Sequence, residues 1–160
     1  MAGDSSDGGD LMELILWRHA EARDGIPDST RELTGKGVKQ AKNMAEWLDS
    51  RLPKGTRILS SPATRCQQTA EALGKYKETP AVDVGASARD VLDAAGWPDA
   101  VTAAVVVGHQ PTLGEVAALL LSGAEEEWSV KKGGIWWFSS RERDGGMEVV
   151  LRAVLSPELT

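Results

Sequence analysis

The stretch Leu14-Ile-Leu-Trp-Arg-His-Ala20 decides the fold of this 160-residue chain, because an apolar run ends directly in a charged pair. The run, opened by Met12, predicts a strand that is buried on both faces. Arg18 and His19 then lie at its carboxyl end, where open α/β sheets place their ligand sites. An arginine binds phosphate as a fork, and a neutral imidazole is a nucleophile. Taken alone, the pair is better explained by a capping arginine and a surface histidine, so the assignment depends on a second anion-binding cluster.

Composition indicates one globular domain, expected over residues 12–160, with 41% apolar and 26% charged residues. The acidic, Gly/Ser-rich residues 1–11 are predicted to be a disordered tail and do not resemble a secretory signal. The net charge of -6 argues against general binding to nucleic acid or to a membrane surface. The single cysteine, Cys66, fits a reducing compartment, so we expect a cytoplasmic protein.

Hydrophobic periodicity predicts strands that alternate with helices along the chain. Thr34 is suited to cap a helix, and Ser61 and Pro62 are suited to the N-cap and first turn of the next one. The strands are expected at 12–18, 57–59, 81–84, 103–107, 135–139 and 147–155, and the helices at 35–52, 62–73, 88–95 and 112–121. This order favours an α/β three-layer sandwich with a mostly parallel central sheet, helices on both faces and a closing antiparallel hairpin.

Three predicted strand-to-helix junctions carry similar chemistry. The first ends in Arg18 and His19, the second carries Arg65 one turn into its helix, and the third carries His109. Helix N-termini favour anions, and cationic donors are what phosphoryl transfer requires. Both histidines of the chain fall at such junctions, so the sequence predicts a phosphate pocket.

Each of these residues also has an ordinary structural explanation. His109 alone fits a core histidine whose hydrogen bonds are satisfied, and Arg65 alone fits an ion pair with Glu71. Cys66 is interpreted as a small core residue rather than a catalytic thiol.

Four blocks together resemble the histidine phosphatase superfamily over roughly residues 12–155. They are Arg18-His19, Arg31-Glu-Leu-Thr34-Gly-Lys-Gly37, Ser60-Ser-Pro-Ala-Thr-Arg65-Cys-Gln-Gln-Thr69 and Val107-Gly-His109-Gln-Pro111. The short middle segment and the Lys131-Lys-Gly-Gly134 stretch resemble the SixA-type phosphohistidine phosphatases. The resemblance implies a minimal phosphoglycerate mutase-like form of the sandwich.

The resemblance also implies roles for individual residues. His19 would attack phosphorus and become phosphohistidine, while Arg18, Arg65 and His109 hold the phosphoryl oxygens. Water would then hydrolyse the phosphoenzyme, and neither a metal nor another cofactor is expected. His19 must be neutral to attack, and we expect the two flanking arginines to oppose its protonation by charge repulsion.

Two departures from the family pattern concern the same site. The usual glycine after the histidine is Ala20 here. No residue matches the proton-donating acid of the larger members, since Asp90 and Asp93 fit a solvated helix face. Asp28, in Asp28-Ser-Thr-Arg31, resembles an acidic position of the SixA-type motif, which implies that it is the acid or water-activating group. Arg31 either contacts substrate or anchors the loop to Asp28.

The lack of a clear proton-donating acid in the sequence leads to a hypothesis about the substrate. An imidazole leaving group needs less help than an alkoxide once its ring is protonated, so protein phosphohistidine is the expected substrate. A histidine-phosphotransfer domain would be the partner that the resemblance implies. Two alternatives stay open: a phosphatase of small phosphate esters on the same fold, and an inactive module that binds phosphate or a phosphopeptide. The sequence does not indicate an oligomeric state.

Overall fold

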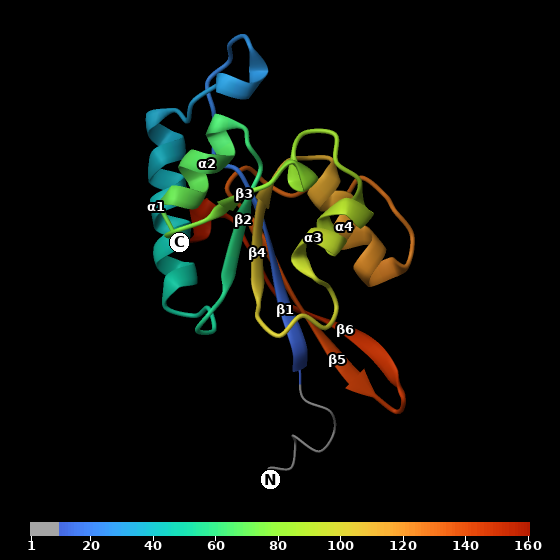
Figure 1. Ribbon diagram of the computed structural model, residues 1–160. Helices are drawn as coiled ribbons and strands as arrows, with labels where there is room; N and C mark the ends of the chain where they lie inside the picture. Colours follow the sequence, from blue (N-terminus) through green and yellow to red (C-terminus); the bar gives the residue numbers. More distant parts are fainter. Residues whose placement is uncertain (1–9) are drawn as a thin grey trace.

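A six-stranded mixed sheet forms the centre of the computed structural model, which describes residues 10–160 (Figure 1). The strand order is β3-β2-β4-β1-β5-β6. Pairing is parallel among β3, β2, β4 and β1 and antiparallel between β1, β5 and β6. The strands are β1 (Asp10–Arg18), β2 (Arg57–Ser60), β3 (Lys77–Glu78), β4 (Ala104–Gly108), β5 (Ile135–Arg143) and β6 (Gly146–Leu155). The mostly parallel sheet with a closing hairpin confirms the expected fold class.

Helices cover both faces of this sheet, so the fold has three layers (Figure 1). The α-helices are α1 (Gly35–Asp49), α2 (Thr64–Glu71), α3 (Ala88–Ala95) and α4 (Thr112–Ser122), and the short 3-10 turns are η2 (Asp28–Thr30), η3 (Pro80–Val82) and η4 (Pro157–Leu159). As predicted, Thr34 caps α1, and its side chain accepts a hydrogen bond from the Gly37 N–H. Among the helices in the described range, none is long and apolar enough to cross a membrane.

Side chains along β1 point alternately to the two faces of the sheet, so this strand packs against both helical layers. Leu14 and Leu16 face the core shared with α3 and α4, whereas Ile15 and Trp17 face the core shared with α1 and α2. All four side chains are fully buried. Burial of each one stabilises the fold by roughly 1.5–3 kcal/mol. The fully apolar run is therefore explained by a central strand with a core on each face.

The structure differs from the sequence-based expectations at the chain's start and in its middle. Asp10 and Leu11 belong to β1 rather than to a tail, and the remainder of the expected tail, residues 1–9, lies outside the described residues. No strand forms at 81–84, where the chain instead makes the 3-10 turn η3 and leaves it at Asp83, because Thr79 caps that turn by accepting a hydrogen bond from the Ala81 N–H.

The second helix also begins later than expected. It starts at Thr64 rather than Pro62, with Ala63 in the N-cap position. The Ser61 hydroxyl does not cap this helix, because it accepts from the Ala63 N–H in a tight turn and donates to Asp83. The turn places the Ser61 side chain at the strand end, next to the candidate site.

Candidate active site

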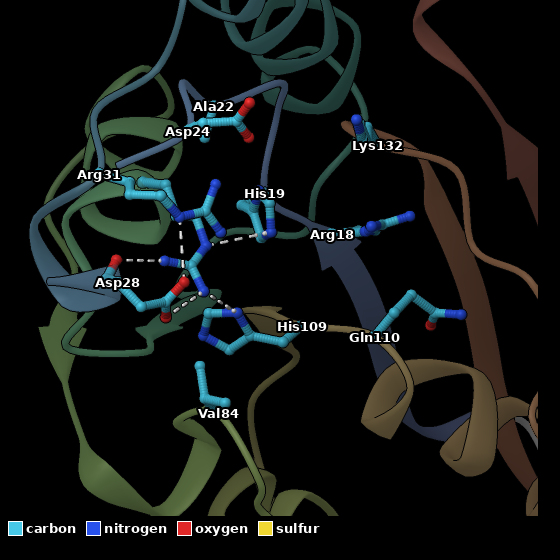
Figure 2. A pocket seen from close by; sticks show the side chains of 11 residues that line it. Arg18, His19, Ala22, Asp24, Asp28, Arg31, Val84, His109, Gln110 and Lys132 are labelled. Atoms are coloured by element: carbon cyan, nitrogen blue, oxygen red, sulfur yellow. Dashed lines mark hydrogen bonds and ion pairs between the residues drawn. The ribbon is translucent and has the colours of Figure 1, made fainter. Parts of the chain in front are cut away.

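The three strand-to-helix junctions meet at one edge of the sheet. The His19 N–H donates to the Gly108 carbonyl at 3.1 Å, and the Ser61 N–H donates to the Val107 carbonyl at 3.1 Å. These backbone bonds align the ends of β1, β4 and β2. The structure therefore brings the predicted phosphate-binding residues into one pocket (Figure 2).

The His19 ring is held in one orientation by its own backbone neighbour. Its Nδ1 lies 2.8 Å from the Ala20 carbonyl oxygen, so Nδ1 carries the proton and donates. Its Nε2 accepts a hydrogen bond from the Arg65 Nε–H at 3.3 Å. The Nε2 lone pair therefore faces the cationic side of the pocket, where a phosphoryl group would lie.

Burial keeps His19 neutral. The residue is 7% exposed, and this burial lowers the pKa of His19 to about 3. Its hydrogen bond to Ala20 opposes that change, while the charges of His109, Arg65 and Arg18 add to it. Loss of hydration is a larger cause than the repulsion by arginines that we expected from sequence.

Arg65 lies at the centre of the pocket and contacts both histidines. It is 3% exposed, and its Nη2 lies 3.3 Å from His109 Nδ1 in addition to the Nε contact with His19. Its Nη1 donates to the Asp28 carbonyl at 2.9 Å and its Nη2 to Asp28 Oδ2 at 3.1 Å. The guanidinium therefore lies between the two histidines and the Asp28 carboxylate, and a fork of this kind also suits a bound anion.

His109 forms the wall opposite β1. Its ring centroid lies 5.5 Å from that of His19, and the residue is 4% exposed. Burial, followed by the charge of Arg65, lowers the pKa of His109 to about 4. Its Nε2 lies 2.8 Å from Ser61 Oγ, on the side away from Arg65.

Arg18 extends from the end of β1 along the side of the cavity. Its Nη1 donates to the Val130 carbonyl at 2.8 Å, and burial lowers the pKa of its guanidinium. Its Nε is buried, and within residues 10–160 it has no hydrogen-bond acceptor. A buried N–H without an acceptor is costly, so this donor is suited to an oxyanion ligand.

Asp28 on η2 and Arg31, which directly follows η2, form the rim of the site. Arg31 Nε donates to Asp28 Oδ1 at 3.0 Å, and the Asp28 side chain is 58% exposed. Slight burial raises the pKa of Asp28, but the hydrogen bonds from Arg31 and Arg65 outweigh it and leave the pKa below its usual value. An ionised carboxylate of this kind is a poor proton donor and a suitable proton acceptor.

A cavity of about 420 Å³ lies between these residues. The sequence-based assignment missed five of its lining residues, and Figure 2 shows Gln110 and Lys132 on the side of Arg18. These five are Ala22, Asp24, Val84, Gln110 and Lys132. For Lys132, the one signal in the sequence was its place beside Gly133 and Gly134, in the stretch that resembles the SixA-type phosphatases.

Cys66 lies next to His109 but is not placed for nucleophilic chemistry. The thiol is fully buried, and burial raises the pKa of Cys66 to about 12. This agrees with its interpretation as a core residue. Among residues 10–160, no group of three His, Cys, Asp or Glu side chains is arranged to hold a metal ion.

Ala20 fits its position without strain. Its side chain is fully buried in a small cluster with Leu33 and Ala41, and its N–H donates to Thr69 Oγ1 at 3.1 Å. Of the described non-glycine residues, only Asp144 has a positive φ. The backbone at residue 20 therefore does not require glycine.

Comparison with known proteins identifies the class of this chain. Residues 14–89 match the histidine phosphatase superfamily (branch 1). Phosphohistidine phosphatase SixA of Escherichia coli is 31% identical over 124 residues, which cover 70% of this chain and 76% of that protein. An uncharacterized protein of Picosynechococcus sp. is 37% identical over 136 residues, covering 78% of this chain and 82% of that protein.

Solved structures show the same fold. A SixA structure from Nakamurella multipartitia covers 94% of this chain and 99% of its own, with 26% identity and a TM-score of 0.73. A phosphoserine phosphatase from Entamoeba histolytica covers 92% of this chain and 98% of its own, with 20% identity and a TM-score of 0.67.

The chain belongs to the histidine phosphatase superfamily, and this membership supports phosphatase activity. Within the superfamily its similarity is to the SixA-type members.

Proposed function

We propose that this protein hydrolyses protein phosphohistidine through a covalent phosphohistidine on His19. The observation that carries the proposal is the orientation of the His19 ring. Its Nδ1–H is bound to the Ala20 carbonyl, and its Nε2 lone pair faces Arg65 at 3.3 Å. This arrangement supplies a neutral, oriented nucleophile next to cationic donors for the phosphoryl oxygens.

In the first step, His19 Nε2 forms a bond to phosphorus as the bond from phosphorus to the leaving group breaks. Before this step, the ring nitrogen of the substrate that does not carry phosphorus takes a proton from solvent. The imidazole then keeps the electron pair of the broken bond and leaves as neutral histidine. Arg18, Arg65 and His109 surround the phosphoryl oxygens, where negative charge is concentrated. Arg65 must exchange its contacts with Asp28 for contacts with the phosphoryl group.

In the second step, a water oxygen attacks phosphorus and the bond to His19 Nε2 breaks, which releases inorganic phosphate. The water proton requires an acceptor. Asp28 is the proposed acceptor, because the hydrogen bond from Arg31 still favours its ionised carboxylate after Arg65 has turned to the phosphoryl group. Asp28 is thus assigned as the water-activating group rather than as the general acid.

The proposed substrate class follows from the carboxylates of the site. The cavity is lined by two, Asp24 and Asp28, and Asp28 is held ionised. An alkoxide leaving group needs a proton donor, whereas a protonated imidazole does not. The exposed rim leaves room for a protein surface, so the proposed partner is a phosphorylated protein such as a histidine-phosphotransfer domain. The proposed compartment is the cytoplasm.

A substrate panel tests this proposal. A phosphohistidine protein, a phosphoserine peptide and sugar phosphates are compared at equal concentration, with His19→Ala as the control. We expect the highest kcat/KM for the phosphohistidine protein and no loss of rate with a chelator. Equal or faster turnover of phosphoserine would overturn the substrate assignment.

A phosphatase of small phosphate esters is the second candidate. The observation in its favour is that a phosphoserine phosphatase shares this fold, as the Entamoeba histolytica structure shows. Lys132 and Arg31 also line the cavity and could bind the carboxylate of a small substrate. Faster turnover of small esters than of the phosphohistidine protein in the panel would favour this candidate.

A further inference from the structure

The Ser61 hydroxyl connects His109 to a carboxylate outside the cavity. Ser61 Oγ lies 2.8 Å from His109 Nε2 and 3.1 Å from Asp83 Oδ1. Ser61 is fully buried, and Asp83 directly follows η3. Asp83 does not line the cavity, and its hydrogen-bonded connection to His109 runs through Ser61.

The donors in this chain of hydrogen bonds have one consistent arrangement. A carboxylate only accepts, so the Ser61 O–H donates to Asp83. Ser61 Oγ then accepts from the Ala63 N–H and from His109 Nε2–H. The Nε2 proton of His109 therefore points away from the cavity, and Nδ1 faces Arg65 and the phosphoryl site.

This orientation has a chemical consequence. A neutral His109 with its proton on Nε2 presents only a lone pair to the cavity, and a lone pair repels a phosphoryl oxygen. His109 binds that oxygen when Nδ1 is protonated too, which makes the ring an imidazolium. The imidazolium needs a nearby negative charge, and Asp83 is joined to it by two hydrogen bonds.

We propose that Asp83, acting through Ser61, is a positioning residue that orients His109 and balances its positive charge when His109 donates to a phosphoryl oxygen. The inference rests on the proposed function of the pocket as a phosphoryl site. In the step itself, a phosphoryl monoanion transfers its O–H proton to Nδ1. An Nδ1–H bond forms as an O–H bond breaks, and no bond to phosphorus changes.

Charged and titratable groups from several elements act on His109, and Asp83 is distinct among them. They are Arg18 and His19 from the end of β1, Asp28 from η2, Arg65 and Cys66 from α2, and Asp83 after η3. Asp83 and Asp28 both favour protonation of His109, but Asp28 is paired with Arg31 and Arg65. A phosphoryl group would replace Asp28 at Arg65, whereas the contact through Ser61 is on the opposite side of the ring and would persist.

Two variants separate the hydrogen bonds from the charge. Asp83→Asn keeps an oxygen that accepts from Ser61 and from the Val84 N–H, which now donates to Asp83 Oδ1 at 2.7 Å, but it removes the negative charge. Ser61→Ala interrupts the chain of hydrogen bonds and leaves Asp83 in place. The matched control is Asp93→Asn, which changes an exposed aspartate on the neighbouring helix α3.

The first measurement is the ¹⁵N NMR titration of His109 with inorganic phosphate bound, in a chain that has two histidines. We expect phosphate to raise the pKa of His109 in the wild type and in Asp93→Asn. The rise should be smaller in Asp83→Asn and Ser61→Ala, with roughly tenfold weaker phosphate binding near neutral pH. An identical titration in all four proteins would overturn the proposal.

The second measurement is the pH profile of kcat. In Asp83→Asn we expect kcat to fall roughly tenfold to a hundredfold, with the alkaline limb of the profile moved to lower pH. A uniform loss without movement of that limb would indicate a merely structural role and would contradict the proposal. The phosphate titration needs no turnover, so its result is independent of whether the proposed hydrolysis occurs.

Discussion

The buried wall and the exposed rim of this pocket are built in different ways. His19, Arg65 and His109 are 7%, 3% and 4% exposed. The ends of β1 and β4 position the two histidines, and the first turn of α2 positions Arg65. On the rim, the Asp28 side chain is 58% exposed and lies on a three-residue 3-10 turn. A preorganised wall suits phosphoryl transfer, and a solvated rim suits recognition of a variable partner. In the proposed function, the wall therefore carries the bond-breaking chemistry and the rim accepts the proton from water.

Within the buried wall, the largest loss of activity is expected for His19→Ala. Phosphatase activity should fall to background, because no other side chain presents a ring nitrogen to phosphorus in the same position. The fold should persist, since His19 lies at the end of β1 and not within either main core. Activity assays and thermal unfolding measure the two effects, and near-normal turnover would remove the site assignment.

The next largest effect is expected for Arg65→Ala. Removal of one donor to transition-state charge costs roughly 10²–10³ in rate, and Arg65 contacts both histidines. Arg65→Lys should recover only part of the activity, because an ammonium lacks the fork. Steady-state kinetics of the two variants provide the measurement; equal rates for Lys and wild type would argue against a bidentate contact.

The rim is tested by Asp28→Asn. If Asp28 accepts the water proton, hydrolysis of the phosphoenzyme should slow by roughly tenfold to a hundredfold while its formation changes less. Rapid-quench kinetics should then show a burst and a larger steady-state fraction of phosphoenzyme. Asp24→Asn, which changes the other cavity carboxylate, is the comparison variant and should not alter the ratio of formation to breakdown. A slower formation step with no accumulation would instead assign Asp28 as an acid.

The buried histidines also predict a dependence of stability on pH. The pKa of His19 is about 3 and that of His109 about 4, against an ordinary value of 6.5 in the unfolded chain. Between pH 6.5 and about 4, the unfolded chain therefore binds more protons, and the free energy of unfolding falls as the pH falls. Each histidine contributes up to roughly 1.4 kcal/mol per pH unit.

Urea unfolding of the wild type and of His19→Asn across this range measures that contribution. The variant should lose less stability on acidification, by the share of one histidine. The same slope in both proteins would show that His19 is not buried in its neutral form.

The smallest effect is expected for Ala20→Gly. The alanine packs against Leu33 and Ala41 without a positive φ, so glycine should leave kcat within about twofold and destabilise the fold by about 1 kcal/mol. A large gain in kcat would instead show that Ala20 marks a modified site.

The sequence predicted the elements whose pattern is local. The apolar runs of β1 and β4, the Thr34 cap and the helix at Ala88–Ala95 all agree with the structure. The strand expected at 81–84 was wrong, because proline at residue 80 and the Thr79 cap favour a 3-10 turn over sheet pairing. The start of the second helix was wrong because the Ser61 hydroxyl is used by residues distant in sequence.

The residues of the candidate site also divide into those that a local sequence pattern predicted and those that depend on tertiary contacts. Arg18, His19 and His109 were predictable because they lie at the ends of strand patterns, and Arg65 because it lies in the first turn of the helix that follows one. The carboxyl ends of parallel strands meet at one edge of a sheet. Asp83 belongs to a segment whose path is set by tertiary contacts, so no local pattern marked it. Gln110 and Lys132 stand in stretches that carry the family resemblance, but their place in the cavity wall depends on contacts between distant segments. The choice of Asp28 as an acid or a base likewise depends on its pairing with Arg65, which is 37 residues away in sequence.

The most direct test of the central claim is trapping of the phosphoenzyme. The protein is incubated briefly with a phosphohistidine donor, quenched and mapped by peptide mass spectrometry. We expect an acid-labile phosphate on His19 in the wild type and none in His19→Ala. Tight phosphate binding without any phosphorylated His19, or phosphate on another residue, would contradict it and favour a binding module.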